Sequence, residues 1–321
     1  MIVTVTCNPA LDKTVTLDEL AVGELNRLGP AEADAGGKGI NVSKTIAALG
    51  GQSVATGFVG GGVGRDLARQ VAAWPGIAAD FIEVAGQTRT NLKVIDHGSR
   101  LTELNEPGVW VTAAEAEALA SQVEGYARDG ATVVLAGSLC QGVDPSFYAD
   151  LIRRIHAAGG QVALDADGEA FRRGLEAGPD LVKPNRHELW ELATAAGHPD
   201  IPPTADALSL ADLAALATDL IEGGRAGRVA VSLGGDGALF VAEGRVLRAP
   251  ALDVPVLSTV GAGDAMMAAL VWGSVTGLSW PDTATLALAC SAGAVTTRGT
   301  KPPQRDLVDA LSAQVRLTEL S

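Results

Sequence analysis

Residues 112–136, TAAEAEALASQVEGYARDGATVVLA, contain a helix and a strand in immediate succession. Thr112 and Glu115 have the spacing of a capping box, in which two side chains satisfy the first free amides of a helix. The alanine- and glutamate-rich residues that follow predict a helix that ends near Gly130. Residues 131–136 are mostly apolar and β-branched, which predicts a buried strand. A helix followed at once by a buried strand is typical of a parallel sheet built from βαβ units.

The same alternation of strands and helices continues on both sides of this segment. Further strands are predicted at residues 1–6, 53–59, 161–165, 180–183 and 228–232. Helices are predicted around Val42, from the N-cap pair Asp144-Pro145, and from Ser209. This rhythm predicts one α/β domain with a mostly parallel sheet covered by helices on both faces. Ligands of such sheets bind beyond the carboxyl ends of the strands, so the site is expected in the loops found there.

Two segments depart from the alternation. Residues 14–33 have alternating apolar positions without a helical period, and residues 88–104 predict a hairpin with a turn at His97-Gly98. Together they predict a small separate β-sheet, from about residues 12–34 and 88–106, that lies over the strand ends of the main sheet. We call this sheet the lid.

Composition restricts the possible functions. The 321 residues are 47% hydrophobic and 19% charged, with a formal net charge of −14. An acidic chain is poorly suited to non-specific nucleic-acid binding, which depends on Lys and Arg. The three cysteines are far apart and lack a CxxC spacing, which predicts buried thiols rather than disulfides or zinc. No stretch approaches the roughly 20 apolar residues of a membrane span, so a cytoplasmic protein is expected.

The strongest chemical motif is Ser258-Thr259-Val260-Gly261-Ala262-Gly263-Asp264, which leads into a predicted helix. Free amides at a helix start favour an anion, so Gly261, Ala262 and Gly263 predict a site for a phosphoryl group. Asp264, in the first turn, is then positioned to accept a proton from an attacking hydroxyl. Taken alone, these four residues are equally compatible with a tight turn and an acidic helix cap.

This motif resembles the C-terminal signature of the PfkB/ribokinase family of sugar kinases. Three further landmarks of the family occur in the same order: Gly36-Gly37-Lys38-Gly39-Ile40-Asn41-Val42, Asn185-Arg186-His187-Glu188 and Ser232-Leu233-Gly234-Gly235-Asp236-Gly237-Ala238. Each landmark alone has a simpler interpretation: a flexible turn, a polar helix start, or a turn between strands. Four landmarks in order carry the resemblance, which spans essentially the whole chain. It implies a ribokinase-like three-layer α/β/α fold with a β lid, and ATP as the phosphoryl donor.

The resemblance also implies roles for individual residues. The nucleotide would be bound by Lys183, Asn185, Ser232, Gly234, Gly235, Gly237 and Gly263. Asn185 and Glu188 would position Mg²⁺ through water. The acceptor would be bound by Asp12, Gly37, Lys38, Gly39, Asn41, Arg89, Ser138 and Asp165.

Cations near the predicted acceptor loops suggest that the acceptor carries a phosphate. Lys38, Arg89 and Arg27 fall in the glycine loop and the two lid segments of a strongly acidic chain. The alternative is that Arg27 and Arg89 are solvated strand residues. The finer resemblance is to 1-phosphofructokinases and tagatose-6-phosphate kinases. It is carried by residues 6–12, 35–43, 88–91, 102–108 and 182–185.

That resemblance implies phosphorylation of a ketohexose phosphate, first of all fructose 1-phosphate to fructose 1,6-bisphosphate. Tagatose 6-phosphate, an unphosphorylated sugar and a nucleoside remain alternative acceptors, and a non-catalytic sugar-phosphate sensor is the alternative of another class. Ser258 stands where ribokinase-like members have an aspartate that helps to bind a monovalent cation, which leaves dependence on that cation open. The exposed lid predicts a homodimer in which two lids pair.

Overall fold

The computed structural model of the protein describes residues 1–29, 31–96, 100–198 and 201–320. The strands of its large sheet are β1 (Ile2–Thr6), β4 (Ser53–Gly60), β5 (Ile77–Ala79), β6 (Ile82–Val84), β9 (Thr132–Ala136), β10 (Gln161–Asp165), β11 (Leu181–Val182), β12 (Val229–Ser232), β13 (Ala238–Ala242), β14 (Arg245–Ala249) and β15 (Thr318–Leu320). Their order is β15-β14-β13-β12-β11-β10-β9-β1-β4-β5, with β6 also paired to β4. The strands from β5 to β12 pair in parallel, and β13 to β15 add an antiparallel edge. The predicted, mostly parallel sheet is confirmed.

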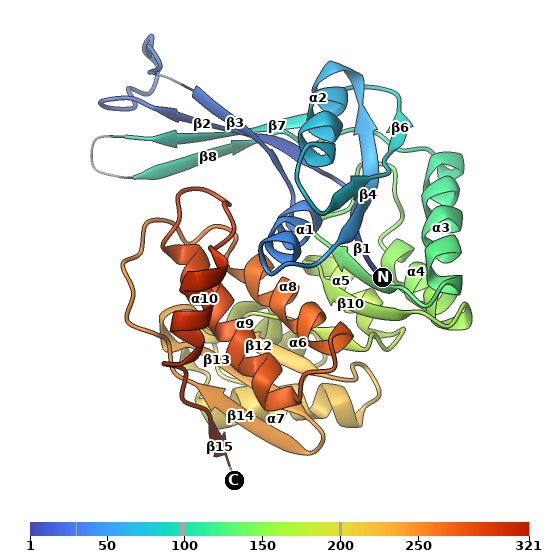
Figure 1. Cartoon of the computed structure of the whole chain (residues 1–321), viewed down its shortest axis with the longest axis vertical. Coiled ribbons are helices and arrows are strands. Elements are labelled where there is room, and N and C mark those ends of the chain that lie inside the picture. The colour runs from blue at the N-terminus through green and yellow to red at the C-terminus, as the bar shows by residue number, and fades with distance from the viewer. Residues whose placement is uncertain (30, 97–99, 199–200, 321) are drawn as a thin grey trace.

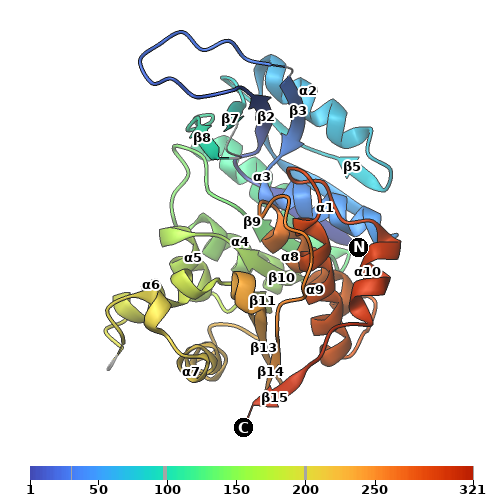
Figure 2. The same ribbon diagram turned by 90° about the vertical axis from the view of Figure 1, so that its left-hand side faces the viewer.

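Helices cover both faces of this sheet, as Figure 2 shows. One face is packed by α3 (Ala113–Arg128), α4 (Phe147–Ala157), α5 (Gly168–Leu175), α6 (Arg186–Ala195) and α7 (Leu210–Glu222). The other is packed by α1 (Lys38–Ala48), α8 (Ala262–Val275), α9 (Trp280–Val295) and α10 (Arg305–Ser312). α2 (Gly61–Ala72) packs with α1 in a smaller apolar cluster, and η1 (Ala205–Ala207) and η2 (Gly234–Asp236) are single 3₁₀ turns. The three-layer arrangement is therefore as predicted.

Local signals placed most helix starts correctly. The capping boxes at Thr112 and Ser209 are both formed, so α3 and α7 begin where the sequence predicts. The start predicted at Asp144-Pro145 is wrong, because α4 begins at Phe147. The Asp144 side chain accepts a hydrogen bond from the Ser146 amide at 2.8 Å. This pair therefore closes a turn that precedes the helix.

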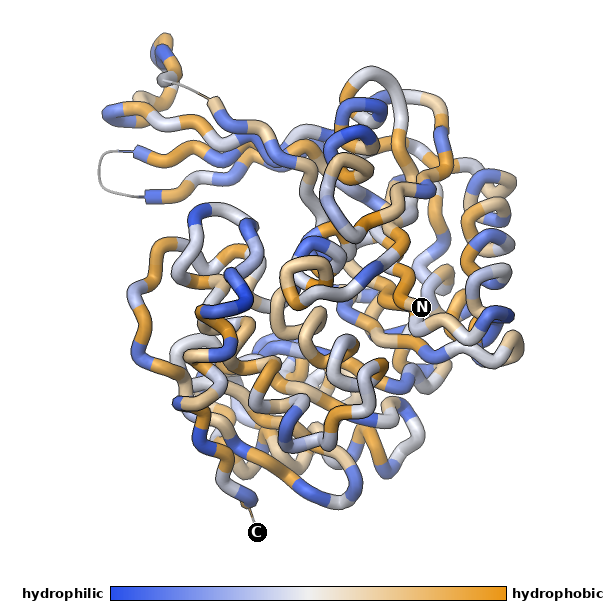
Figure 3. Tube along the Cα trace, in the orientation of Figure 1, coloured by the Kyte–Doolittle hydropathy of each residue, from blue (hydrophilic) through white to orange (hydrophobic). Residues whose placement is uncertain are grey.

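The lid is a second sheet that projects from the body (Figure 1). It consists of β2 (Ala10–Thr16), β3 (Ala31–Gly36), β7 (Arg89–Ile95) and β8 (Leu101–Asn105), in the order β3-β2-β7-β8. The central pair β2 and β7 is parallel, with Asp12 opposite Asn91, and the outer pairs are antiparallel. Hydrophilic and hydrophobic residues alternate along its strands (Figure 3). The turn predicted at His97-Gly98 lies outside the described residues.

The three cysteines, Cys7, Cys140 and Cys290, are buried free thiols, as predicted. Across the described ranges, no helix is both long enough and apolar enough to cross a bilayer.

Candidate active site

Asp264 lies in the first turn of α8, and its side chain is buried. Gly261, the N-cap, has φ 84°, a left-handed conformation that glycine adopts readily. The side-chain amide of Asn41 donates a hydrogen bond to Asp264 Oδ2 at 2.8 Å. Burial, together with the negative charge of Asp165, raises the pKa of Asp264 to about 6, although Asn41 and nearby ammonium groups act in the opposite direction. A carboxyl group with such a pKa is well suited to take up a proton near neutral pH.

The start of α8 also presents its first amides, which lack acceptors within the helix. Gly263 has no side chain to fill the space between these amides and Lys183. A Cβ atom on this residue would lie only 3.1 Å from the Lys183 ammonium. A helix N-terminus and a cation therefore face the same space. Both favour an anion there. The role of Gly261, Ala262 and Gly263 in holding a phosphoryl group stays a prediction.

Asp165 lies at the end of β10 between two lysines. Its Oδ1 is 3.2 Å from Lys38 Nζ, and its Oδ2 is 3.2 Å from Lys183 Nζ. Burial alone would raise the pKa of Asp165, but the two ammonium groups hold it below its usual range. Burial would likewise lower the pKa of Lys38, but Asp165, Asp264 and Glu188 raise it. The carboxylate thus holds both lysine side chains beside Asp264.

Predicted acceptor residues from two elements lie next to the Asp264 site. Gly37 caps α1, so that Lys38 and Asn41 lie in its first turn next to the Asp264 site, with Gly39 buried between them. Ser138 follows β9 and is half-buried. Its neighbour Gly137 is adjacent to Lys38, because a Cβ on Gly137 would lie 3.8 Å from Lys38 Cβ. The glycine loop and the loop after β9 therefore border the same space.

Arg89 begins lid strand β7 and is half-buried. Its Nη2 donates to the Asn8 carbonyl at 2.9 Å, and its Nη1 lies 3.4 Å from the Glu106 carbonyl. Its Nε is buried and has no hydrogen-bond partner among the described residues. A half-buried guanidinium with a donor to spare is suited to an anionic ligand.

Arg27 is the one predicted acceptor residue that the structure does not bring to this space. It is exposed in the loop between β2 and β3. That loop forms the tip of the lid in Figure 1, away from the start of α8. A role for Arg27 in binding the acceptor of its own chain has no support from this geometry.

The predicted nucleotide residues lie around the ends of β11 and β12. Asn185 and Ser232 are bridged through their backbones, and the Ser232 amide donates to the Pro184 carbonyl at 3.0 Å. Gly234 and Gly235 form η2, and Gly237 ends it. Lys183 connects this region to Asp165. The structure therefore joins the predicted nucleotide loop to the charged cluster through residues 183–185.

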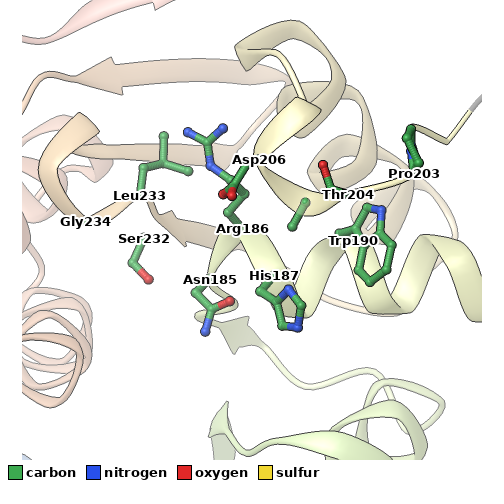
Figure 4. A pocket seen from close by; sticks show the side chains of 11 residues that line it. Asn185, Arg186, His187, Trp190, Pro203, Thr204, Asp206, Ser232, Leu233 and Gly234 are labelled. Atoms are coloured by element: carbon green, nitrogen blue, oxygen red, sulfur yellow. The ribbon is translucent and has the colours of Figure 1, made fainter.

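A pocket of about 570 Å³ lies on the α6 side of the nucleotide loop. Asn185, Ser232 and Gly234 line one end and Thr204 lines the other (Figure 4). His187 and Trp190 stack in its wall with ring centroids 5.6 Å apart. The sequence gives no sign of this pocket, because its walls come from α6, η1 and the loop after β12.

Asn185 and Glu188 form a reciprocal capping box at the start of α6. Asn185 Oδ1 accepts from the Glu188 amide at 2.9 Å, and Glu188 Oε2 accepts from the Asn185 amide at 2.8 Å. Burial raises the pKa of Glu188, and the charges of Lys183 and Asp165 also act on it. Across the described residues, no three His, Cys, Asp or Glu side chains are grouped to hold a metal ion. One carboxylate beside a phosphate site fits Mg²⁺ that keeps most of its water ligands.

Sequence reasoning missed Asn91 and Lys93, which bind the carboxylate of Asp12. Asn91 Nδ2 donates to Asp12 Oδ1 at 3.0 Å, and Lys93 Nζ donates to Oδ2 at 2.8 Å. Arg89, Asn91 and Lys93 alternate along β7, so they point to one face of the lid. Polar residues at every second position of a predicted lid strand could have indicated that Asn91 and Lys93 belong to the same site as Arg89.

Comparison with known proteins identifies the family. Residues 6–307 match the model of the pfkB family carbohydrate kinases. The chain is 34% identical over 319 residues to a 1-phosphofructokinase of Vibrio cholerae, covering 99% of this chain and 97% of the relative. It is 37% identical over 319 residues to that of Haloferax volcanii, with the same coverage. The solved phosphofructokinase-2 of Escherichia coli in complex with potassium superposes with a TM-score of 0.90 at 29% identity, covering 98% of each chain. Arabidopsis thaliana ribokinase, at 21% identity and a TM-score of 0.77 over 97% of this chain and 98% of that one, shares the fold. The chain therefore belongs to the pfkB family of carbohydrate kinases, which are phosphotransferases with an alcohol group as acceptor.

Proposed function

We propose that this protein transfers the γ-phosphoryl group of ATP to fructose 1-phosphate and so forms fructose 1,6-bisphosphate. The observation that carries the proposal is the buried carboxyl group of Asp264, with a pKa raised to about 6, between Asn41 and the start of α8. This pairing combines a proton acceptor with a site for a transferred phosphoryl group. Relatives with about 35% identity over nearly their whole length are named 1-phosphofructokinase, which supports this acceptor.

The proposed reaction uses residues in three roles. Asp264 accepts the proton of the C6 hydroxyl while the hydroxyl oxygen attacks the γ-phosphorus and the bond to ADP breaks. The amides from Gly261 to Gly263, with Lys38 and Lys183, stabilise the negative charge on the transferred group. Asp165 holds these two lysines in place.

The nucleotide would be ATP bound with Mg²⁺. Asn185 and Glu188 would hold the ion through water, and the ion would supply positive charge to the phosphate oxygens. Lys183 and the loop from Ser232 to Gly237 would bind the nucleotide itself. The half-buried Glu188 beside the lysine pair supports this assignment.

The acceptor would be bound between the glycine loop and the lid. The Asp12 carboxylate would accept hydrogen bonds from the sugar hydroxyls, and the Asn41 side chain would accept or donate one, with Ser138 beside them. The spare Nε donor of Arg89 supports a phosphate on the acceptor rather than a neutral sugar.

The lid would also pair two copies of the chain. Val22, Leu25, Leu28, Leu101 and Leu104 are exposed on the lid and its loop, with Val22 91% and Leu25 76% accessible. Exposed apolar residues gathered on one small sheet favour an interface between proteins. One solved relative, at 28% identity, is described as a tetrameric inhibited form. Light scattering on the eluting protein should give twice the mass of the 32.6 kDa chain, and Leu104→Asp should shift the mass toward that of one chain.

A substrate screen tests the proposed activity. ADP release is measured with Mg-ATP and, in turn, fructose 1-phosphate, fructose 6-phosphate, tagatose 6-phosphate, fructose and ribose. The highest kcat/KM is expected for fructose 1-phosphate. A higher value for free ribose or fructose would refute the role of Arg89, and binding of a sugar phosphate without ADP release would identify a sensor.

A further inference from the structure

The carboxylate of Asp12 is held by two side chains of the neighbouring lid strand. β2 and β7 run parallel, with Asp12 opposite Asn91 and Thr14 opposite Lys93. Asn91 donates to Asp12 Oδ1 at 3.0 Å, and the Lys93 ammonium donates to Oδ2 at 2.8 Å. A carboxylate offers about four lone-pair positions. Each oxygen therefore keeps a position with which it can accept a hydrogen bond from a sugar hydroxyl.

The pair is buried, although it lies in the small lid sheet. Asp12 is 8% exposed and Lys93 7%. A second lysine, Lys44, is close by, but its ammonium donates to the Ala35 carbonyl and lies 5.3 Å from the centre of the Trp74 ring. Among the described residues, Lys93 is the cation that forms a salt bridge with Asp12. Removing one partner of a buried pair leaves the other charge uncompensated.

The third side of the carboxylate is closed by Gly36 on β3. A Cβ atom on this glycine would lie 2.6 Å from Asp12 Oδ2, well inside van der Waals contact. The carboxylate is thus bounded by backbone on the β3 side and by donors on the β7 side. Its orientation is set by the lid rather than by the body of the protein.

We propose that Lys93 is a positioning residue for the acceptor: its ammonium fixes the direction of the Asp12 carboxylate, to which the sugar hydroxyls donate hydrogen bonds. This inference rests on the proposed function, because Asp12 binds a sugar only if the protein is the sugar-phosphate kinase proposed above. Among the described residues, the Lys93 ammonium bonds to Asp12, and no hydrogen bond or ion pair joins it to Asp264 or to the predicted nucleotide residues. Its loss should therefore weaken binding of the acceptor and leave the transfer step intact.

The alternative is that the Asp12–Lys93 pair only stabilises the lid. A purely structural pair would change the melting temperature and the amount of active enzyme, but not the concentration of acceptor at which that enzyme is half-saturated. The two interpretations therefore predict different results for KM of the sugar phosphate. The positioning role predicts a higher KM with little change in kcat, and the purely structural role predicts an unchanged KM.

The test compares Lys93→Met with Lys93→Arg and with Lys13→Met in the full-length enzyme. Lys13 is the matched control, because it follows Asp12 on β2 and points to the opposite face of the lid. For Lys93→Met, KM for fructose 1-phosphate should rise about 10- to 100-fold, the usual effect of losing a hydrogen bond to a charged group. KM for ATP should stay unchanged and kcat should stay within about threefold. Lys93→Arg should recover part of the loss, and Lys13→Met should match the wild type.

A double variant covers the case in which Lys93→Met does not fold. Asp12→Asn with Lys93→Met contains no unpaired charge, and its KM for fructose 1-phosphate should equal that of Asp12→Asn alone. A clearly higher KM in the double variant, or an unchanged KM in folded Lys93→Met, overturns the proposal. If Asp12→Asn itself leaves KM unchanged, the fault lies in the proposed acceptor site and not in Lys93 alone.

Discussion

Helices α3 and α6 begin with the same arrangement of side chains. Thr112 and Glu115 form a capping box at α3, and Asn185 and Glu188 form one at α6. Both glutamates lie in the first turn and accept a hydrogen bond from the amide of the N-cap residue. As helix starts, the two sites are equivalent.

Their surroundings are different. Hydrogen bonds from Thr112 lower the pKa of Glu115. Burial raises the pKa of Glu188, which also experiences the charges of Lys183, Asp165 and Lys38. A capping box therefore explains where α6 begins, but it does not explain why the glutamate is buried among charged groups. Perturbed acids of this kind cluster at functional sites.

Asp264 differs most from Glu115, because it lies in the first turn of a helix that has no side-chain cap. Asp264→Asn should lower kcat by roughly 10²- to 10⁴-fold, because the variant cannot accept a proton. The dissociation constant for ATP should change by no more than about threefold, because in the proposed mechanism Asp264 contacts the acceptor hydroxyl and not the nucleotide. Coupled ADP release and equilibrium ATP binding measure the two effects. Retained turnover would make Asp264 an ordinary acidic helix start, like Glu115.

Glu188→Gln and Glu115→Gln test the comparison directly, because glutamine can retain the capping hydrogen bond in both helices. For Glu188→Gln, the Mg²⁺ concentration that gives half-maximal activity should rise about tenfold or more, as expected when a residue beside a metal site is changed. Glu115→Gln should leave it unchanged. Melting temperatures of the two variants control for the helix starts. If the two variants show the same Mg²⁺ dependence, Glu188 serves only to cap α6.

The pH dependence of kcat/KM gives the smallest expected effect. In the proposed mechanism Asp264 works only in its ionised form, and its pKa in the free enzyme is raised to about 6. The value of kcat/KM should therefore be constant above that pH and fall about tenfold for each unit below it. Steady-state rates with the acceptor well below its KM, from pH 4 to 8, would show this limb. A limb near pH 4, the usual range of an exposed carboxylate, would contradict the raised pKa of Asp264.

Features with a local cause were predicted well from the sequence. The start of α3 at Thr112 and the strand at residues 161–165 depend on neighbouring residues only, and both are confirmed. Asp144-Pro145 was misread because an Asx turn and a helix cap use the same residue types. The motif residues could be named, but their partners could not. Asp165 contacts Lys38, which is 127 residues away in the chain, and no local pattern reports that contact.

The parallel pairing of β2 and β7 has a consequence for the order of folding. Asp12 and Asn91 meet across 79 residues, and the intervening chain contains β4, the neighbour of β1 in the main sheet. Closing so long a loop is unfavourable until that chain is already compact. Thr88, just before β7, accepts a hydrogen bond from the Gly60 amide at the end of β4. The β1–β4 pair thus brings the two lid strands together, and we expect the lid to form late in refolding, with affinity for the acceptor regained after the body of the enzyme has formed.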